Sequence, residues 1–206
     1  SIRNGITVHY FKYYMLDKDI AKYFMTGAII MNMLGAACTK LLTDRFDKKR
    51  VYVTLMLCNA VLIPAIYFVG PDDVATLFGI HFLSALLLGP TVPIIFAMYA
   101  DIADYSEAKR NRRATGLVFA GASFSQKVGW GAGGAASGFL LAFYNYQPNV
   151  AQTPDTLEGM RLMFSVIPGV CVVLAAGVML IYPLTDRAMQ EISAILAEKK
   201  LRADPI

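Results

Sequence analysis

Five long apolar runs, separated by short charged segments, limit what this chain can fold into. They occupy residues 23–39, 51–71, 74–100, 114–149 and 162–185. Each run approaches or exceeds the length of about 20 residues that an α-helix needs to cross about 30 Å of hydrocarbon. Charged residues make up only 17% of the chain and its mean hydropathy is +0.50. This composition is typical of a membrane protein and disfavours a water-soluble globular one.

Only helices can account for these runs. Lipid offers the backbone no hydrogen bonds, so every N–H and C=O must be paired internally, and the runs are too long for the strands of a barrel. The chain is therefore expected to be an all-α integral membrane protein. Residues 1–16 are too short and too polar for a complete span, and we expect them to be the end of a helix that begins earlier. Counting this incomplete helix, the predicted membrane segments are six, at approximately 1–16, 23–42, 51–69, 74–100, 115–143 and 160–183.

The segment 74–100 contains Gly89-Pro90 and Pro93 near its middle. Proline removes a backbone donor and kinks a helix. We expect a kink here, either as a feature of packing or as the point at which a rocking helix bundle bends.

The distribution of lysine and arginine among the connections predicts the orientation of the chain. Cytoplasmic loops of membrane proteins carry the excess of positive charge. Alternate connections are strongly basic, and their bases are Arg45, Lys48, Lys49 and Arg50, then Lys109, Arg110, Arg112 and Arg113, then Arg187, Lys199, Lys200 and Arg202. The intervening connections contribute only Lys18 and Lys22. We therefore expect residues 43–50, 101–113 and 184–206 in the cytoplasm, with the loops 16–22, 70–73 and 144–159 outside.

The last part of the chain, residues 184–206, departs from the apolar pattern. Leu184, Ile192, Ile195 and Leu196 lie near one stripe of a helix, between charged positions. This spacing indicates either an amphipathic helix that lies under the membrane or a plain solvated tail. In both cases the C-terminus is expected in the cytoplasm.

Lys127 stands deep within the otherwise uncharged run SFSQKVGWGAGGAASGF, residues 123–139. A charge inside a membrane is costly unless it faces a polar cavity, which indicates a functional site. Helical spacing places Ser123 and Trp130 on the face of Lys127, with Gln126 at its edge. A cation, a hydroxyl group and an indole together suit a sugar or a carboxylate. The alternative is that the span begins later and Lys127 extends its charge to the cytoplasmic interface.

The stretch MYADIADYSEAKRNRRATG, residues 98–116, places three acids and then four bases after an apolar run. Asp101, Asp104 and Glu107 share one face of a helix that continues past the bilayer. Acids oppose the dipole at a helix C-terminus, so bases are needed nearby. The expected partners are Arg112 and Arg113 together with Asp44, Arg45, Lys49 and Arg50 of the loop 43–50. A charge network between helix ends can hold one side of a transporter closed, so we interpret these residues as a cytoplasmic gate.

Two alternatives remain open for this acidic and basic stretch. One is a solvated loop that does no more than mark the cytoplasmic side. The other is an enzymatic site, because D-x-x-D followed by bases binds a metal ion and a phosphate ester in magnesium-dependent membrane transferases. No second set of ligands accompanies this single acidic cluster. We therefore expect neither enzymatic activity nor a metal site.

The run GPTVPIIFAMYADIADYSEAKRNRRATGLVFAGASFSQKVGWGAGG resembles part of the glycoside–pentoside–hexuronide:cation symporters, which are typified by melibiose permease within the major facilitator superfamily. It is similar to their tenth span, the following cytoplasmic loop and their eleventh span. The most specific part is MYADIADYSE, followed by R-x-A-T-G and S-x-x-x-K. The similarity extends over essentially the whole chain, from a remnant of the seventh helix, YFKYYML, to the twelfth span. The motif TDRFDKKR is similar to the facilitator signature D-R-x-G-R-R but has Asp47 in place of the glycine.

The resemblance implies a six-helix bundle that is one half of a transporter built from two parallel repeats. It implies that Lys127 and Ser123 lie near the sugar and cation sites. It also implies a cytoplasmic gating network formed by Asp101, Asp104, Glu107 and Arg113. The principal sugar-binding and cation-binding carboxylates of such transporters lie in the first six helices, which are not in this chain.

The expected function is that of half of a secondary active transporter. It would couple Na⁺ or H⁺ to the import of a glycoside, pentoside or hexuronide by alternating access. The expected partners are the sugar, an amino-terminal six-helix half and the lipid of the inner (plasma) membrane, with no nucleic acid and no cofactor besides the coupling ion. Two other functions remain open, a membrane scaffold or binding module and a lipid or drug transporter of the same fold.

Overall fold

The computed structural model describes residues 1–17 and 19–203, and the side chains of these residues up to residue 199. Lys18, the side chains of Lys200 and Arg202, and residues 204–206 of the expected tail lie outside this description. The regular elements in the described ranges are all helical. In chain order they are α1 (Ile2–His9) with a π-helical turn (Tyr10–Tyr14), α2 (Ile20–Ala37), α3 (Thr39–Thr43), α4 (Lys48–Ala65) with a 3₁₀ turn (Ile66–Phe68), α5 (Val74–Leu88), α6 (Thr91–Arg110), α7 (Thr115–Phe143), α8 (Pro154–Phe164), α9 (Val166–Leu180) and α10 (Asp186–Ala203).

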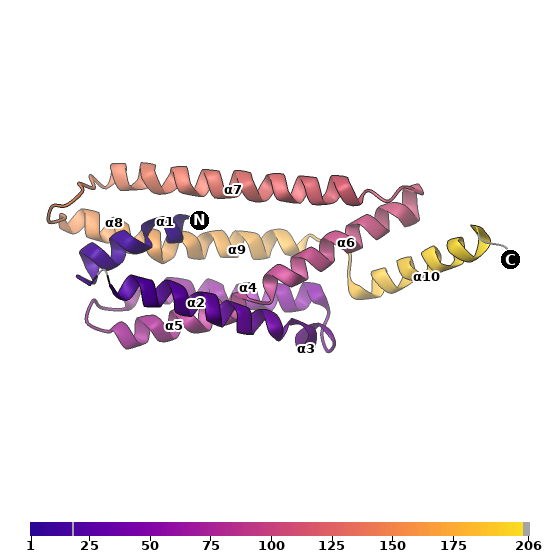
Figure 1. Ribbon diagram of the computed structural model, residues 1–206, viewed down its shortest axis with the longest axis horizontal. Helices are drawn as coiled ribbons and strands as arrows, with labels where there is room; N and C mark the ends of the chain where they lie inside the picture. Colours follow the sequence, from indigo (N-terminus) through magenta and orange to yellow (C-terminus); the bar gives the residue numbers. More distant parts are fainter. Residues whose placement is uncertain (18, 204–206) are drawn as a thin grey trace.

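The long helices lie side by side along the long axis of the molecule (Figure 1). The connections from α3 to α4, α6 to α7 and α9 to α10 gather at one end, and these are the connections rich in lysine and arginine. We call this the basic end. The connections from α1 to α2, α4 to α5 and α7 to α8 gather at the other end, which we call the opposite end. The two sets of loops that differ in charge are thus separated by the length of the bundle.

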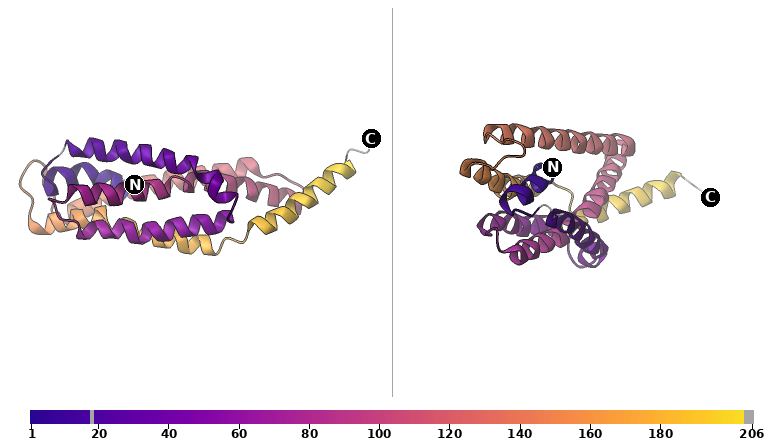
Figure 2. Two further views of the ribbon diagram at one scale, coloured as in Figure 1. Left: turned by 90° about the horizontal axis from the view of Figure 1, so that it is seen from below. Right: turned by 60° about the vertical axis from the view of Figure 1, so that its left-hand side comes forward.

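Four of the helices pack in a row, with α2 against α5, α5 against α4 and α4 against α9. In the left view of Figure 2, α2 and α4 lie apart, with α5 between them. The largest buried cluster lies toward the opposite end, where Tyr10 stacks on Phe164 at 4.2 Å between ring centroids and Phe11 contacts Phe24 at 4.8 Å. These rings fasten α1 and its π-helical turn to α2 and α8. A smaller cluster joins α4 to α6 near the basic end.

Helices α2 and α5 approach so closely that their backbones touch. A Cβ atom added to Gly35 would lie 2.0 Å from the carbonyl oxygen of Leu86, and one added to Gly89 would lie 2.2 Å from that of Asn32. Only glycine fits such a contact between helices. Gly89 also precedes Pro90, and the predicted single segment 74–100 is divided here into α5 and α6 because proline has no N–H to donate. Figure 1 shows α6 leaving the direction of α5 and running out to the basic end.

Polar side chains begin several of the helices. Asp47 accepts hydrogen bonds from the N–H groups of Lys49 and Arg50 at the start of α4, which gives a structural reason for an acid where the facilitator signature has glycine. Asp73 caps α5 in the same way. The hydrogen bonds from the Thr76 hydroxyl and N–H hold the pKa of Asp73 below its usual range. The capped start of α4 lies at the basic end, and the capped start of α5 lies at the opposite end.

Four helical segments in the described part of the chain are long and apolar enough to cross a membrane. They are Ile20–Ala37, Lys48–Phe68, Val74–Arg110 and Pro154–Leu180. These overlap the predicted segments 23–42, 51–69, 74–100 and 160–183, whereas the predicted bundle of six spans is not confirmed. Residues 1–16 form only α1 and its π-helical turn. The long helix α7 is less apolar because Ser123, Gln126, Lys127 and several glycines interrupt its hydrophobic residues.

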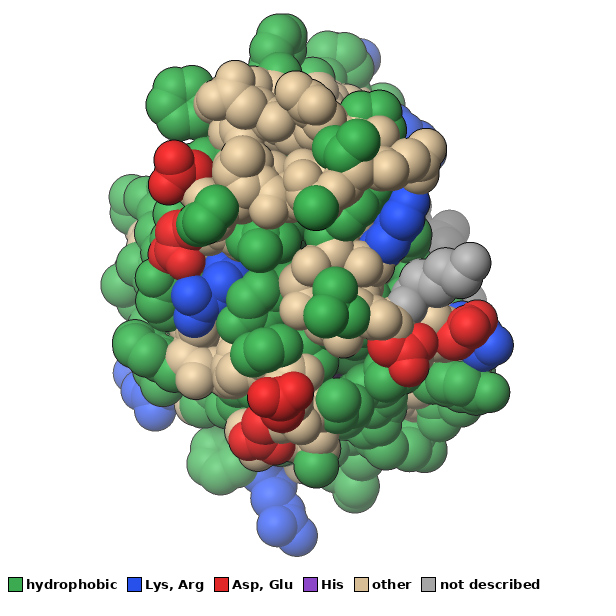
Figure 3. Space-filling view, turned by 90° about the vertical axis from the view of Figure 1, so that its left-hand side faces the viewer, with side chains coloured by type: hydrophobic (Ala, Val, Ile, Leu, Met, Phe, Trp, Pro, Cys, Tyr) green, Lys and Arg blue, Asp and Glu red, His purple; other side chains and the backbone are tan. Residues whose placement is uncertain are grey.

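The outer surface of the bundle is strongly apolar. Val61, Val178 and Ile181 are each more than 70% exposed, and many other large hydrophobic side chains are exposed with them. Soluble monomers rarely carry such a surface, whereas lipid favours it. Figure 3 views the molecule from the opposite end, where acidic and basic side chains lie between hydrophobic ones that extend around the outline. The chain is therefore an integral membrane protein.

Candidate functional site

The predicted sugar-binding face lies on α7, the long helix at the edge of the bundle in Figure 1. Ser123, Gln126, Lys127 and Trp130 all lie within this helix and are all exposed. The Lys127 ammonium lies 4.8 Å from the centroid of the Trp130 ring, a cation–π contact that the spacing of three residues allows. Among the described residues, Lys127 forms no ion pair. The structure thus brings a cation and an indole together on an open face, and their role remains a prediction.

Helix α7 contacts its neighbours at its start and in its second half. It packs against α6 close to its start and against α1 and α8 farther along. The Ser1 hydroxyl donates to the carbonyl oxygen of Trp130 at 3.0 Å, and a Cβ atom added to Gly133 would lie 2.5 Å from that of Ser1. Space around Gly121, Gly129 and Gly131 is open among the described residues. The part of α7 that precedes its contact with Ser1 therefore has an uncovered face. Lys127 lies in this part.

The acids at the end of α6 are held by a base from the following turn. Helix α6 ends at Arg110, and Asn111 takes the left-handed conformation with φ of 54°, so that the chain turns back. Arg113 then reaches Asp104 at 2.8 Å and Glu107 at 3.6 Å. Asp104, Glu107 and Arg113 thus form one ion-pair group, which we call the α6 turn cluster, and Arg113 joins it through the turn rather than through helical spacing.

A second charged group joins three helices at the basic end. The ammonium of Lys48, the first residue of α4, lies 2.5 Å from the Asp101 carboxylate of α6 and 3.4 Å from the Asp186 carboxylate of α10. The N–H of Lys48 also donates to Asp186 at 3.0 Å, and the N–H of Asp186 donates to Asp47 at 2.8 Å. These side chains are largely shielded from solvent. We call this group of Lys48, Asp101 and Asp186 the three-helix cluster.

The structure corrects the expected partners of these acids. Asp44, Arg45 and Arg50 form no ion pair in the part of the chain that the structure describes, so they are not brought to Asp101, Asp104 or Glu107. Lys49 instead donates to the carbonyl oxygens of Leu180 and Tyr182 at the end of α9. The base that reaches α6 is Lys48, because the Asp47 cap fixes it at the first turn of α4.

The tail forms helix α10, which packs against the end of α6. Leu184, Met189 and Ile192 are buried there against Ile102 and Tyr105. Lys199 donates to the carbonyl oxygen of Ala108 and to the side chain of Asn111, both at 2.7 Å. The apolar stripe seen in the sequence therefore faces α6 at Leu184 and Ile192, while Ile195 is 46% exposed. Figure 1 shows α10 extending from the basic end, beyond the bundle.

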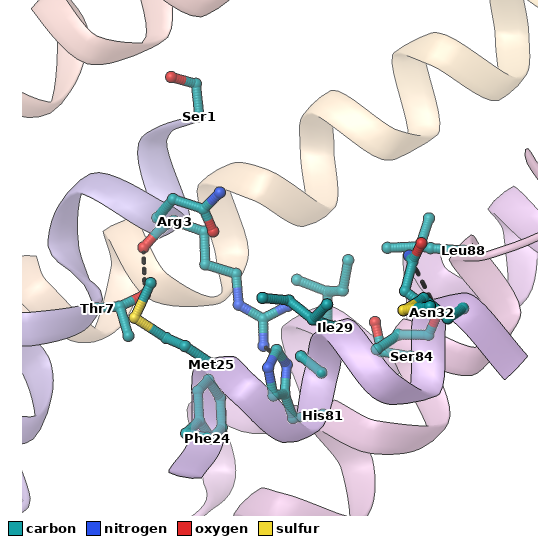
Figure 4. A pocket seen from close by; sticks show the side chains of 15 residues that line it. Ser1, Arg3, Thr7, Phe24, Met25, Ile29, Asn32, His81, Ser84 and Leu88 are labelled. Carbon is teal, nitrogen blue, oxygen red and sulfur yellow. Dashed lines mark hydrogen bonds between the residues drawn. The ribbon is translucent and has the colours of Figure 1, made fainter. Parts of the chain in front are cut away.

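A cavity of about 520 Å³ lies between α1, α2 and α5, and the sequence analysis did not identify it. Arg3 of α1 enters it and meets His81 of α5, with 2.6 Å between Nη2 and Nδ1 (Figure 4). Asn4, Asn32 and Ser84 supply further polar groups to its wall. The sequence contained two signals, Arg3 in a segment otherwise expected to enter the membrane and His81 inside the apolar run 74–100.

The described residues hold no group of three His, Cys, Asp or Glu side chains that could bind a metal ion. The acids of the α6 turn cluster are instead neutralised by Arg113, and Asp101 is neutralised by Lys48. The acids at the end of α6 are therefore members of ion pairs at the basic end of the bundle.

With the bundle and its charged end established, comparison with known proteins identifies the class. A family described as MFS/sugar transport protein matches residues 1–186. The chain therefore belongs to this family, and its resemblance to the glycoside–pentoside–hexuronide:cation symporters is confirmed. Membership places it among transporters rather than among enzymes, so the transferase alternative for the acidic stretch is set aside.

Its relatives include characterised and uncharacterised carriers. The chain is 31% identical over 199 residues to an isoprimeverose transporter of Lactiplantibacillus pentosus, covering 96% of this chain and 41% of the relative. It is 30% identical over 203 residues to the inner membrane symporter YicJ of Escherichia coli (strain K12), covering 98% and 44%. It is 24% identical over 198 residues to a glucuronide carrier protein homolog of the same strain, covering 94% and 43%. The chain thus spans less than half the length of each of these relatives.

Proposed function

We propose that this chain is the carboxy-terminal six-helix half of a secondary active transporter, which couples Na⁺ or H⁺ to sugar import by alternating access. The proposal counts α1 and α7 as membrane segments beside the four that are apolar enough by themselves. Helix α7 has 29 residues and a length of about 44 Å at 1.5 Å per residue, so it can cross about 30 Å of hydrocarbon. Its polar face would then border the substrate path rather than lipid.

The observation that carries the proposal is the three-helix cluster. It ties α4, α6 and α10 together at one end of the bundle through charges that are shielded from solvent. In this proposal the ion-pair group is either formed or broken, and ligand binding elsewhere would favour one of these two states. We infer that it is formed when the basic end is closed and broken when that end opens. The α6 turn cluster would act at the same stage, whereas Asp44, Arg45 and Arg50 would contribute only positive charge.

The break at Gly89-Pro90 supplies a place where this motion can occur. Because Pro90 has no N–H, the helical hydrogen bonding is weakened between α5 and α6, and α6 would tilt relative to α5 at this point. The tight contact of Gly35 and Gly89 keeps α5 on α2 during such a tilt. Alternating access by movement of helix bundles around a central site is the mechanism of this class of fold.

The substrate in this proposal is a glycoside, pentoside or hexuronide, in line with the relatives named as isoprimeverose and glucuronide carriers. Lys127 would bind the sugar and couple it to the cation, Trp130 would stack on the sugar ring, and Ser123 and Gln126 would bind its hydroxyl groups. The coupling ion would be held mostly by carboxylates of an amino-terminal half, which would complete the transporter. The basic end would face the cytoplasm of a cell whose inner membrane holds the protein.

Uptake measurements on the complete protein that carries these residues test the proposal. Vesicles would be given labelled pentosides, galactosides and uronides, with Na⁺ and H⁺ gradients imposed separately. Accumulation of one sugar class with one gradient is expected. Uptake of lipids or drugs alone would favour a carrier of another class, and no uptake of any solute would favour a membrane scaffold.

A further inference from the structure

The guanidinium of Arg3 is unusual among the cations of this chain because it is enclosed by the bundle without an acidic partner. Its Nη2 atom meets Nδ1 of His81, 2.6 Å away. Its Nε atom is shielded from solvent and has no hydrogen-bond partner in the described part of the chain. No aspartate or glutamate is among the described residues that line the cavity. A neutral imidazole can accept one hydrogen bond, but it leaves the positive charge uncompensated.

Aromatic rings hold this guanidinium in a fixed position. Its carbon atom lies 4.9 Å from the centroid of Phe164 and 5.9 Å from that of Phe24. His81 stacks on Phe24 with 3.6 Å between the ring centroids and 5° between the planes. Rings stabilise a cation but do not neutralise it, and a charge away from water requires an opposite charge nearby. The arrangement is therefore preorganised for an anion that this chain does not itself supply.

The cavity around Arg3 has the size and the lining of a small-molecule site. Its volume of about 520 Å³ falls within the range of about 300–1,000 Å³ that is usual for ligand pockets. Figure 4 shows Arg3 reaching from α1 to His81, with Asn32 and Ser84 farther along the same wall. The Asn32 amide nitrogen donates to the carbonyl oxygen of Ala85 at 3.4 Å, which leaves its amide oxygen to accept from a hydroxyl group.

The mouth of the cavity lies on an exposed part of α2. Met25 and Ile29 are 42% and 62% exposed and stand at its edge. Apolar side chains around a polar interior suit the C–H face of a sugar ring, while the amides and the guanidinium suit its oxygens. The planar guanidinium can bind two oxygens of one oxyanion in parallel, which an ammonium such as that of Lys127 cannot do.

We propose that this cavity between α1, α2 and α5 binds the oxyanion of an acidic sugar, a carboxylate or a sulfonate, through Arg3. The assignment rests on the proposed function, since the ligand is taken to be the transported sugar, and it narrows that sugar to an acidic one. His81 positions the guanidinium, and Asn32 binds a hydroxyl group of the same ligand.

Binding to the complete protein in phosphatidylcholine nanodiscs tests this proposal. The probes are D-glucuronate, its uncharged amide D-glucuronamide, and a sugar that carries a sulfonate at the same carbon. The unmodified protein is expected to bind both acids at least about tenfold more tightly than the amide, because charge-assisted hydrogen bonds are formed only with the acids. Arg3→Gln should abolish this preference, while Arg3→Lys should retain part of it. Arg187→Gln, which removes an exposed arginine outside the bundle, should leave it unchanged.

The comparison of acid with amide in the unmodified protein does not depend on the folding of any variant. Equal binding of acid and amide, with sugar transport intact, would overturn the assignment of this cavity and leave the proposed function standing. Displacement of glucuronate by phosphatidylglycerol in the nanodisc would also overturn it, since the oxyanion would then be a lipid phosphate. Failure to bind or transport any sugar would overturn both proposals together.

Discussion

The ammonium of Lys48, at the start of α4, lies 2.5 Å from the carboxylate of Asp101, which α6 carries beyond the break at Gly89-Pro90. The two residues are 53 positions apart in the chain. Their contact connects α6 to α4, which packs on both α5 and α9. Asp186 adds a second carboxylate at 3.4 Å, so the ammonium of Lys48 also holds the first residue of α10. In the proposed gate, this one cation would hold the basic end closed.

Asp101→Asn is expected to open the basic end. The pair is only partly exposed, so its loss should cost about 1–3 kcal/mol, between the values for exposed and buried pairs. Met98 lies one turn before Asp101 and is 3% exposed, so a Met98→Cys variant reports opening through its reaction with an aqueous thiol reagent. The reaction rate should rise about tenfold or more in Asp101→Asn, in a background from which Cys38, Cys58 and Cys171 have been removed.

Two variants control for this effect. Lys22→Gln removes an exposed ion pair with Asp19 at the opposite end and should leave the labelling rate unchanged. Lys48→Arg keeps a positive charge beside Asp101 and Asp186 and should retain slow labelling. An unchanged rate in Asp101→Asn would show that the pair does not hold the basic end closed.

Arg113→Gln should weaken the α6 turn cluster by a smaller amount. The Arg113 side chain is 58% exposed, so its ion pairs with Asp104 and Glu107 are expected to contribute about 0.5–1 kcal/mol. The labelling rate of Met98→Cys should rise about two- to fivefold. Arg112→Gln is the matched control, because among the described residues only the backbone carbonyl of Arg112 is engaged, by the hydroxyl group of Ser106. Equal effects of the two variants would contradict a specific role for Arg113.

Gly35→Ala should destabilise the contact between α2 and α5. The added methyl group would lie 2.0 Å from the backbone oxygen of Leu86, which cannot move aside as a side chain can. We expect a loss of about 3 kcal/mol, at the upper end of the usual cost of overpacking. Gly79→Ala lies on α5 with open space around it and should be neutral or stabilising by up to about 1 kcal/mol. Thermal unfolding in detergent, measured by circular dichroism, compares the two variants. A lower unfolding temperature is expected for Gly35→Ala, and an unchanged or higher one for Gly79→Ala.

Lys127→Ala in the complete protein should abolish uphill sugar accumulation while membrane insertion remains intact. The physical reason is the loss of the exposed charge beside Trp130, which no other base on this part of α7 can replace. Vesicle uptake and protein quantification in the membrane measure the two properties separately, with Lys22→Gln as the charge-matched control. Normal accumulation by Lys127→Ala would show that the cation only extends to the membrane interface.

Much of this fold follows from local patterns. Length and apolarity predict the helices at 51–69 and 160–183, and Gly89-Pro90 predicts the break between α5 and α6, because these depend on neighbouring residues alone. The spacing of Asp104 and Glu107 likewise predicts the two acids of the α6 turn cluster, which Arg113 joins through the turn. The turn itself needs Asn111 in the left-handed conformation, which asparagine tolerates.

The three-helix cluster and the cavity at Arg3 depend on contacts between residues far apart in the sequence, which no local pattern predicts. Four bases lie between residues 45 and 50, and charge alone does not distinguish Lys48 from Arg45 or Arg50. The distinction arises from the Asp47 cap and from the position of α4 beside α6. Arg3 and His81 are 78 positions apart and were not connected by any periodicity. The cavity they form could be found only once α1, α2 and α5 were placed together.

Helix α10 lies outside the bundle but contacts two of its helices. Its buried side chains pack against α6, and Asp186 accepts a hydrogen bond from α4. If α6 tilts away from α4 as proposed, α10 would lose one of these two contacts. A fluorescent group on Ile195, which is exposed, would therefore change its surroundings in every transport cycle. If the proposed function holds, the tail would report on turnover in living cells, with no probe inside the membrane and no label near the substrate.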